Sequence, residues 1–221
     1  MEDILPPYVL DEIRNRYITG VASAEYNYRY DQGDEDSLTG ALGQAIATPP
    51  RIVFGPDGRL YEWTIYHYKL RGRGKNAPER RIGADGIFQI EVRDAEKNLA
   101  RRKGLLFQAK KKWQGVDSKL REQAARLADQ PDKAIVVDYS PDGYRACSAV
   151  DAMRAEGNRR RLDGTQFKHL GEYLGEDFLR CRIGVIDLYY DPETETLFNP
   201  TESVTLEEGS DVISTEVRRL V

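Results

Sequence analysis

The chain has 221 residues, of which 40% are hydrophobic and 32% charged, with a formal net charge of −4 at pH 7. This composition excludes pervasive disorder, and no stretch approaches the roughly 18 consecutive apolar residues of a membrane-spanning helix. The start of the chain lacks the basic and apolar regions of a signal peptide, so we expect a cytoplasmic protein without a membrane partner.

The length suits one substantial α/β domain. We expect residues 1–33 to form a lead that packs on this domain and residues 34–200 to form the domain itself. Residues 201–221 are expected to be an acidic tail, either helical or mobile.

The first fifty residues contain two patterns. A short helix is expected at Leu10–Tyr17, and the alternating tyrosines within Ala22–Tyr30 indicate a strand or an extended segment. From Asp34, acidic residues precede an apolar helical repeat, which predicts a helix that ends before two prolines at 49 and 50. Glycine costs roughly 1 kcal/mol in a helix interior, so close packing is expected at Gly40 and Gly43.

Four strands are predicted next. Residues 51–54 and 60–70 flank a Pro-Asp-Gly turn, which is a strong hairpin signal. Gly83–Val92 and Leu105–Lys110 are the other two strands, joined by a charged connection whose length allows hairpin-like pairing.

The second half alternates helices and strands. An amphipathic helix is expected at residues 118–130, a strand buried on both faces at 134–140, and a short strand at 144–150. Helices are then expected at Asp151–Glu156 and Gln166–Tyr173, followed by an apolar strand at Cys181–Tyr190 and a short return strand through Phe198. This order predicts an α/β fold with a mixed β-sheet flanked by helices.

Several familiar chemistries do not fit the sequence. The GRGK segment at residues 72–75 lacks the remaining positions of a phosphate-binding loop, and no GxSxG motif is present. His67 and His169 are the only histidines, and we expect both to be structural or surface residues. Cys147 and Cys181 lie far apart in apolar runs, which is typical of free buried thiols rather than of a disulfide or a zinc site.

After these exclusions, the chemistry that the sequence still allows is metal binding through oxygen ligands. Side chains alternate across a strand, so Gln108 and Lys110 share one face of their strand. If the two strands pair, Asp85, the Gln108 side-chain oxygen and the Ala109 backbone carbonyl offer the oxygen ligands that Mg²⁺ prefers. Lys110 would stand beside them.

These residues, with a helix and an apolar strand after Lys110, resemble the PD-(D/E)xK nuclease superfamily, the fold of many restriction, repair and phage-defence nucleases. The resemblance covers roughly residues 34–150. The family also carries an acid on the helix before its sheet, a place matched by Glu35, with Asp36 as the competitor. It implies a restriction-endonuclease-like fold and a DNA endonuclease dependent on Mg²⁺ or Mn²⁺, acting in restriction or antiphage defence.

Two departures from the family pattern matter unequally. Ala84 replaces a proline that is not a ligand, whereas Gln108 replaces an acid and removes one negative charge from the metal site. Glutamine variants are known in the superfamily, so the change does not imply an inactive enzyme. The resemblance implies metal ligands at Asp85, Gln108, Ala109 and Glu35, a lysine that orients the attacking water, and products with 5′-phosphate and 3′-hydroxyl ends.

Basic segments supply candidate contacts to the phosphate backbone of double-stranded DNA. They comprise Arg71, Arg73, Lys75, Lys111, Lys112, Arg159 and Arg160. Control by an ATPase or another defence-system subunit, or by homo-oligomerisation, is expected. The alternative is a non-catalytic module of the same fold that binds nucleic acid or a partner protein.

Each motif also has a plain structural interpretation. Asp85-Gly86 alone would be a turn, and Gln108 with Lys110 would be the wet face of an edge strand. The acids near Glu35 would only begin a helix, and the basic segments would only be solvated loops. The spacing and the order of elements together favour the nuclease hypothesis.

Overall fold

The computed structural model describes residues 1–31, 33–69, 84–94, 96–128, 132–194, 196–200 and 206–220. Within these residues the chain forms a nine-stranded mixed sheet flanked by helices, which confirms the predicted α/β class. The strands of this sheet are β1 (Thr48–Phe54), β2 (Leu60–Lys69), β3 (Ala84–Asp94), β4 (Leu99–Lys111), β5 (Ala134–Ser140), β6 (Gly143–Ser148), β7 (Lys168–His169), β8 (Val185–Ile186) and β11 (Leu206–Arg219). A separate hairpin consists of β9 (Tyr189–Asp191) and β10 (Thr196–Phe198).

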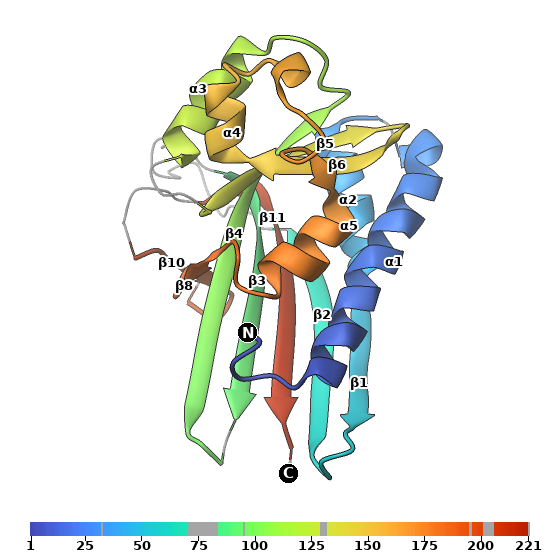
Figure 1. The fold of residues 1–221 in the computed structure, drawn as a ribbon, viewed down its shortest axis with the longest axis vertical. Coiled ribbons are helices and arrows are strands. Elements are labelled where there is room, and N and C mark those ends of the chain that lie inside the picture. Colours follow the sequence, from blue (N-terminus) through green and yellow to red (C-terminus); the bar gives the residue numbers. More distant parts are fainter. Residues whose placement is uncertain are drawn as a thin grey trace.

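The helices cover both faces of the sheet (Figure 1). They are α1 (Pro7–Asp31), α2 (Glu35–Ile46), α3 (Ser118–Leu127), α4 (Ala149–Arg154), the short α5 (Leu170–Glu172), the 3-10 turn η1 (Arg159–Arg161) and the π-helical turn η2 (Tyr173–Phe178). One core cluster joins α1, α2, α5 and η2 to one face, and two others join α3, α4 and the β9–β10 hairpin to the opposite face. Among the described helices, none has the length and apolar run needed to span a membrane.

The sheet runs in the order β1-β2-β11-β3-β4-β5-β6-β7, and β8 pairs with β4. β11 is parallel to β3, and β4 is parallel to β5, whereas β3 and β4 are antiparallel. The parallel step from β4 to β5 is possible because α3 crosses over between them. The expected β1–β2 hairpin and β3–β4 pairing are therefore confirmed.

The C-terminal residues correct the sequence prediction. Instead of a helical or mobile tail, residues 206–219 form β11, which lies between β2 and β3 in the middle of the sheet. Val212, Ile213 and Val217 are each 0% exposed. β-Branched residues suit a strand that is covered on both faces, and here that preference outweighs the acidic character of the segment.

The N-terminal prediction was right only in part: Leu10–Tyr17 is helical as expected, but Ala22–Tyr30 is helical too rather than extended. Residues 7–31 form the single helix α1 rather than a short helix followed by an extended segment. Its buried stripe of Val9, Ile13, Tyr17 and Val21 recurs every four residues, as a helix requires. Figure 1 shows α1 running along one face of the sheet, where its stripe joins the main core.

The helix α2 begins as predicted at the acidic residues. Asp34 is its N-cap, with a side chain that accepts a hydrogen bond from the Ser37 N–H at 2.7 Å. A Cβ on Gly43 would overlap the imidazole ring of His67, which confirms the close packing expected there. At Gly40 the space is open, so the same expectation was wrong.

The segment after α4 is less regular than predicted. Instead of a helix over Gln166–Tyr173, the chain forms β7, α5 and the start of η2. Cys181–Tyr190 is not one strand, because Cys181, Gly184 and Asp187 adopt positive φ angles of 58°, 90° and 63°. Cys181 is exposed rather than buried, whereas Cys147 is buried as expected, and both thiols are free.

Candidate active site at the paired ends of β3 and β4

Asp85 and the central residues of β4 meet where the β3–β4 pair ends. Gly86 pairs with Phe107, so the next pair along the antiparallel ladder sets Asp85 opposite Gln108. The Asp85 Oδ2 atom accepts hydrogen bonds from Gln108 Nε2 and, at 2.7 Å, from the Ala109 N–H. The structure thus brings together the three residues that the sequence placed on neighbouring strands.

The Gln108 amide leaves one atom unsatisfied. Gln108 is 2% exposed, and its Oε1 atom has no hydrogen-bond partner within the described part of the chain. Buried polar atoms in folded proteins almost always have a partner, so an orphan oxygen points to a group that binds there. An amide oxygen beside a carboxylate is a donor set that suits a hard divalent cation.

Glu35 approaches the same edge of β4 from α2. Its Oε1 atom accepts a hydrogen bond from the Lys111 N–H at 3.1 Å. The N–H groups of Ala109 and Lys111 both point to the β3 side of β4 and lie about 7 Å apart, with the Ala109 carbonyl between them. Asp85 and Glu35 therefore flank that carbonyl along one strand edge.

Asp36, the competitor of Glu35, is directed elsewhere. Its side chain is 73% exposed and pairs with Lys69 at 2.8 Å. Glu35 is thus the acid of α2 that reaches the strand. Among the described residues, no group of three or more His, Cys, Asp or Glu side chains could hold a metal ion, so any cation here would depend on amide and carbonyl oxygens as well.

Lys110 lies on the same strand face as Gln108 and is 8% exposed. Within the described residues its ammonium group forms no hydrogen bond or ion pair. Burial of an unpaired charge is costly, so Lys110 is a candidate for a role in this site. The predicted neighbourhood of Asp85, Gln108 and Lys110 on one face is present.

Asp138 is a further buried carboxylate at this site, and it was not among the predicted site residues. It lies on β5 in register with Lys110 and accepts a hydrogen bond from the Trp113 N–H at 2.8 Å. Burial raises the pKa of Asp138 to about 6, opposed by the Trp113 N–H and the Arg159 cation. The signal was available, because one acid interrupts an otherwise apolar strand, AIVVDYS.

His67 is a structural residue, as the sequence indicated. Its Nε2 atom lies 2.7 Å from Oδ1 of Asp211, and both side chains are buried beneath α2. Asp211 belongs to β11, so this pair ties the C-terminal strand to β2 next to the candidate site. Sequence reasoning missed Asp211 because it assigned that segment to the tail.

The predicted DNA-contact residues fall into three groups. Arg71, Arg73 and Lys75 lie outside the described residues. Lys111 Nζ donates to the Gly33 carbonyl at 3.2 Å, so this side chain is tied to the turn before α2. Lys112, Arg159 and Arg160 line a cleft of about 640 Å³ beyond the end of β4.

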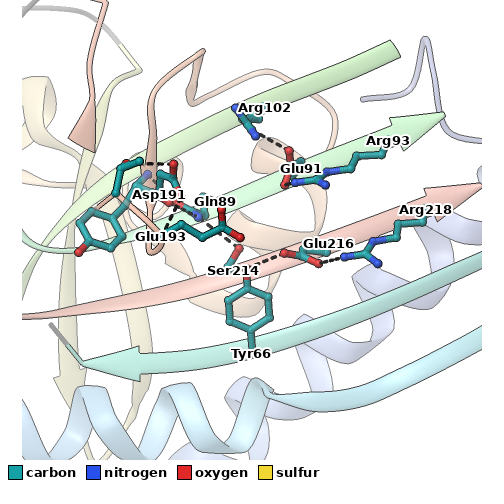
Figure 2. Close-up of polar contacts among 12 residues, drawn as sticks. Tyr66, Gln89, Glu91, Arg93, Arg102, Asp191, Glu193, Ser214, Glu216 and Arg218 are labelled. Carbon is teal, nitrogen blue, oxygen red and sulfur yellow. Dashed lines mark hydrogen bonds and ion pairs between the residues drawn. The ribbon is translucent and has the colours of Figure 1, made fainter. Parts of the chain in front are cut away.

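A second pocket, of about 220 Å³, lies on the sheet farther from this edge. Figure 2 shows two of its acids already engaged: Glu91 contacts Arg93 and Arg102, and Glu216 accepts from Tyr66 and Arg218. These existing ion pairs leave Glu91 and Glu216 little capacity to bind a ligand. The Asp85 site is therefore the better candidate.

A scan against the profiles of known protein families, a search of curated proteins and a search of solved structures each found no match.

Proposed function

We propose that this protein is a metal-dependent DNA endonuclease of the PD-(D/E)xK type. One observation carries the proposal: the Asp85 carboxylate is joined to Gln108 and to the Ala109 backbone, and the buried Lys110, unpaired among the described residues, is next on the same face. This is the arrangement of acid, oxygen ligand and lysine that phosphodiester hydrolysis uses.

The order of elements supports the same proposal. A helix bearing Glu35 precedes an antiparallel pair that bears Asp85 and Gln108, and a crossover helix leads to a parallel neighbour of the catalytic strand. A restriction-endonuclease-like fold has this order.

The oxygens of Asp85, Gln108, Ala109 and Glu35 fit a single cation that keeps several waters. Bound Mg²⁺ or Mn²⁺ would polarise the scissile phosphate and lower the pKa of an attacking water. Through its hydrogen bonds to β4, Asp85 would hold the oxygen ligands of the cation in position. Lys110 would hold the attacking water or stabilise the charge that develops on the phosphate. The products would carry 5′-phosphate and 3′-hydroxyl ends.

A restriction or antiphage-defence role fits a nuclease with no regulatory element of its own in the described residues. We infer that an ATPase, another defence-system subunit or self-association restrains the enzyme. These partners are part of the proposal.

A non-catalytic module that binds nucleic acid or a partner protein is the second candidate. It is favoured by Gln108, which lacks the charge of the usual acid, and by Asp85 Oδ2, which already accepts two hydrogen bonds. A weak cation site would leave a protein that binds without cutting.

Plasmid cleavage with Mg²⁺ or Mn²⁺ separates the two candidates. We expect the wild type to cut and both Asp85→Asn and Lys110→Met to lose at least about 100-fold in rate, as removal of an electrostatic catalytic group does. Arg180→Ala, a surface change far from the site that removes one charge, should cut normally. Cutting that survives both site changes would remove this site from consideration, and DNA binding without any cutting would favour the module.

A further inference from the structure

The cleft beyond β4 has firmly held walls. The loops at residues 112–117 and 157–160 are joined to each other in one wall, and residues 140–145, around the turn between β5 and β6, also line the cleft. The Arg159 N–H donates to the Gly115 carbonyl at 2.8 Å, and the Asp117 N–H donates to the Gly157 carbonyl at 2.9 Å. Trp113 Nε1 donates to the same Gly157 carbonyl at 3.0 Å. The cleft is therefore formed before any ligand arrives.

Four cations line this cleft, namely Lys112, Arg145, Arg159 and Arg160, against two acids, Asp138 and Asp142. Lys112, Arg145 and Arg160 are exposed, and within the described residues none of the three forms an ion pair. Arginines elsewhere on the surface are mostly paired, including Arg101 with Asp3, Arg180 with Glu2, Arg161 with Glu156 and Arg93 with Glu91. The cleft thus concentrates uncompensated positive charge.

Arg159 is half-buried and held in place by its neighbours. Its guanidinium lies 3.7 Å from the centre of the Phe167 ring and donates to the Leu162 carbonyl at 3.2 Å. A guanidinium fixed in this way has lost much of its rotamer freedom before it meets an anion, which favours binding.

The cleft continues directly from the candidate active site. Asp138 on β5 is in register with Lys110 on β4 and with Arg145 on β6, so the three side chains share one face of adjacent strands. Adjacent strands lie about 5 Å apart, and the row runs from the proposed catalytic lysine into the cleft.

The aromatic residues of the cleft do not serve as stacking platforms. Trp113 is 5% exposed and Phe167 2% exposed, and Arg159 covers the Phe167 ring. Recognition of single-stranded bases relies on accessible aromatic faces, which these two rings do not offer. The cleft therefore offers cationic side chains that suit an anionic ligand.

We propose that this cleft binds successive phosphates of the DNA strand that passes through the Asp85 site, through Lys112, Arg145, Arg159 and Arg160 and without reading bases. The choice of DNA as the ligand rests on the proposed function, whereas the choice of phosphate rests on the cleft itself. Binding should depend steeply on salt and little on sequence.

Fluorescence anisotropy of a labelled DNA duplex in EDTA tests this proposal without cleavage. The double variant Arg145→Ala/Arg160→Ala should bind at least about 10-fold more weakly at 100 mM salt, with a salt slope shallower by about 2. The control Arg101→Ala/Arg180→Ala removes the same charge from paired surface sites and should bind like the wild type. Circular dichroism should show unchanged folding in both, and Arg160→Glu provides a further single change expected to weaken binding.

Equal losses in the cleft and control variants would overturn the proposal, as would an unchanged salt slope. Displacement of the duplex by a mononucleotide at micromolar concentration would overturn the choice of a polynucleotide. The two proposals fail separately. A wild type that never cuts in Mg²⁺ or Mn²⁺ but still binds DNA through the cleft would refute the nuclease and leave the cleft assignment standing.

Discussion

Gln108→Glu changes the donor beside Asp85 into a second carboxylate. In the wild type the Gln108 amide donates to Asp85 Oδ2, and a hydrogen bond to a charged group contributes about 1.5–3 kcal/mol. The variant loses this bond and sets two carboxylates against each other, so the folded state must raise the pKa of one of them. In EDTA at pH 8 we expect the free energy of unfolding to fall by about 2–4 kcal/mol. Stability should recover as the pH falls and the pair takes up a proton.

Divalent cations should reverse this loss if the site holds one. A ligand at 100 times its dissociation constant stabilises the folded state by about 2.7 kcal/mol, and the added charge should strengthen binding. Urea unfolding followed by circular dichroism, in EDTA and in Mn²⁺, measures the recovery. Gln89→Glu is the matched control, because Gln89 is also a buried amide but donates to Ser214 Oγ and to the Tyr190 carbonyl. Equal recovery of both variants, or recovery of neither, would refute the reasoning.

Three further predictions concern the buried Asp138 carboxylate, two glycines of α2 and the C-terminal strand β11. Burial raises the pKa of Asp138 to about 6 from an ordinary 3.8, so the folded state holds a proton that the unfolded chain releases, and stability should fall as the pH rises between these values. At about 1.4 kcal/mol per pH unit the loss approaches about 3 kcal/mol. Asp138→Asn should remove this dependence in urea titrations, and a wild-type pH profile in the variant would contradict it. Gly43→Ala should lower the stability by about 1–3 kcal/mol through overlap with His67, whereas Gly40→Ala, in open space, should raise it by up to about 1 kcal/mol. Thermal unfolding that ranks the two alike would count against this packing. A chain that ends at residue 200 should fail to fold by circular dichroism, because it lacks a central strand; a cooperative transition in that chain would show that β11 is dispensable.

Local patterns accounted for the parts of the fold that the sequence predicted well. The turn between β1 and β2, the acids that begin α2 and the apolar run of β5 each carry their signal within about ten residues. Asp85 and Gln108 could be paired in advance because their strands are sequential and antiparallel. A sequential hairpin leaves few alternative partners.

The parts that were missed depend on contacts between distant segments. Nothing within residues 206–219 indicates that this strand inserts between β2 and β3, because the choice is made by the buried faces of both neighbours. The tyrosines at 26, 28 and 30 alternate in sequence, but only Tyr28 is buried, at 4% exposed, on the helical stripe of α1. Tertiary packing overrode the local pattern in both cases.

The site was predicted more completely than its surroundings. Asp85, Gln108, Ala109 and Glu35 meet along β4, whereas the alignment of Asp138 and Arg145 with Lys110 follows only from the register of β5 with its two neighbours. The residue-by-residue alignment of two strands joined by a crossover helix cannot be read from the spacing of residues within either strand.

The most direct test of the central claim is an anomalous difference map from crystals of the Lys110→Met variant grown with Mn²⁺ and a short DNA duplex. We predict a Mn²⁺ peak in contact with the Asp85 carboxylate, the Ala109 carbonyl and a phosphate oxygen of the DNA. DNA bound with no such peak, or a peak at another group of residues, would contradict the assignment of this edge of β4 as the catalytic centre.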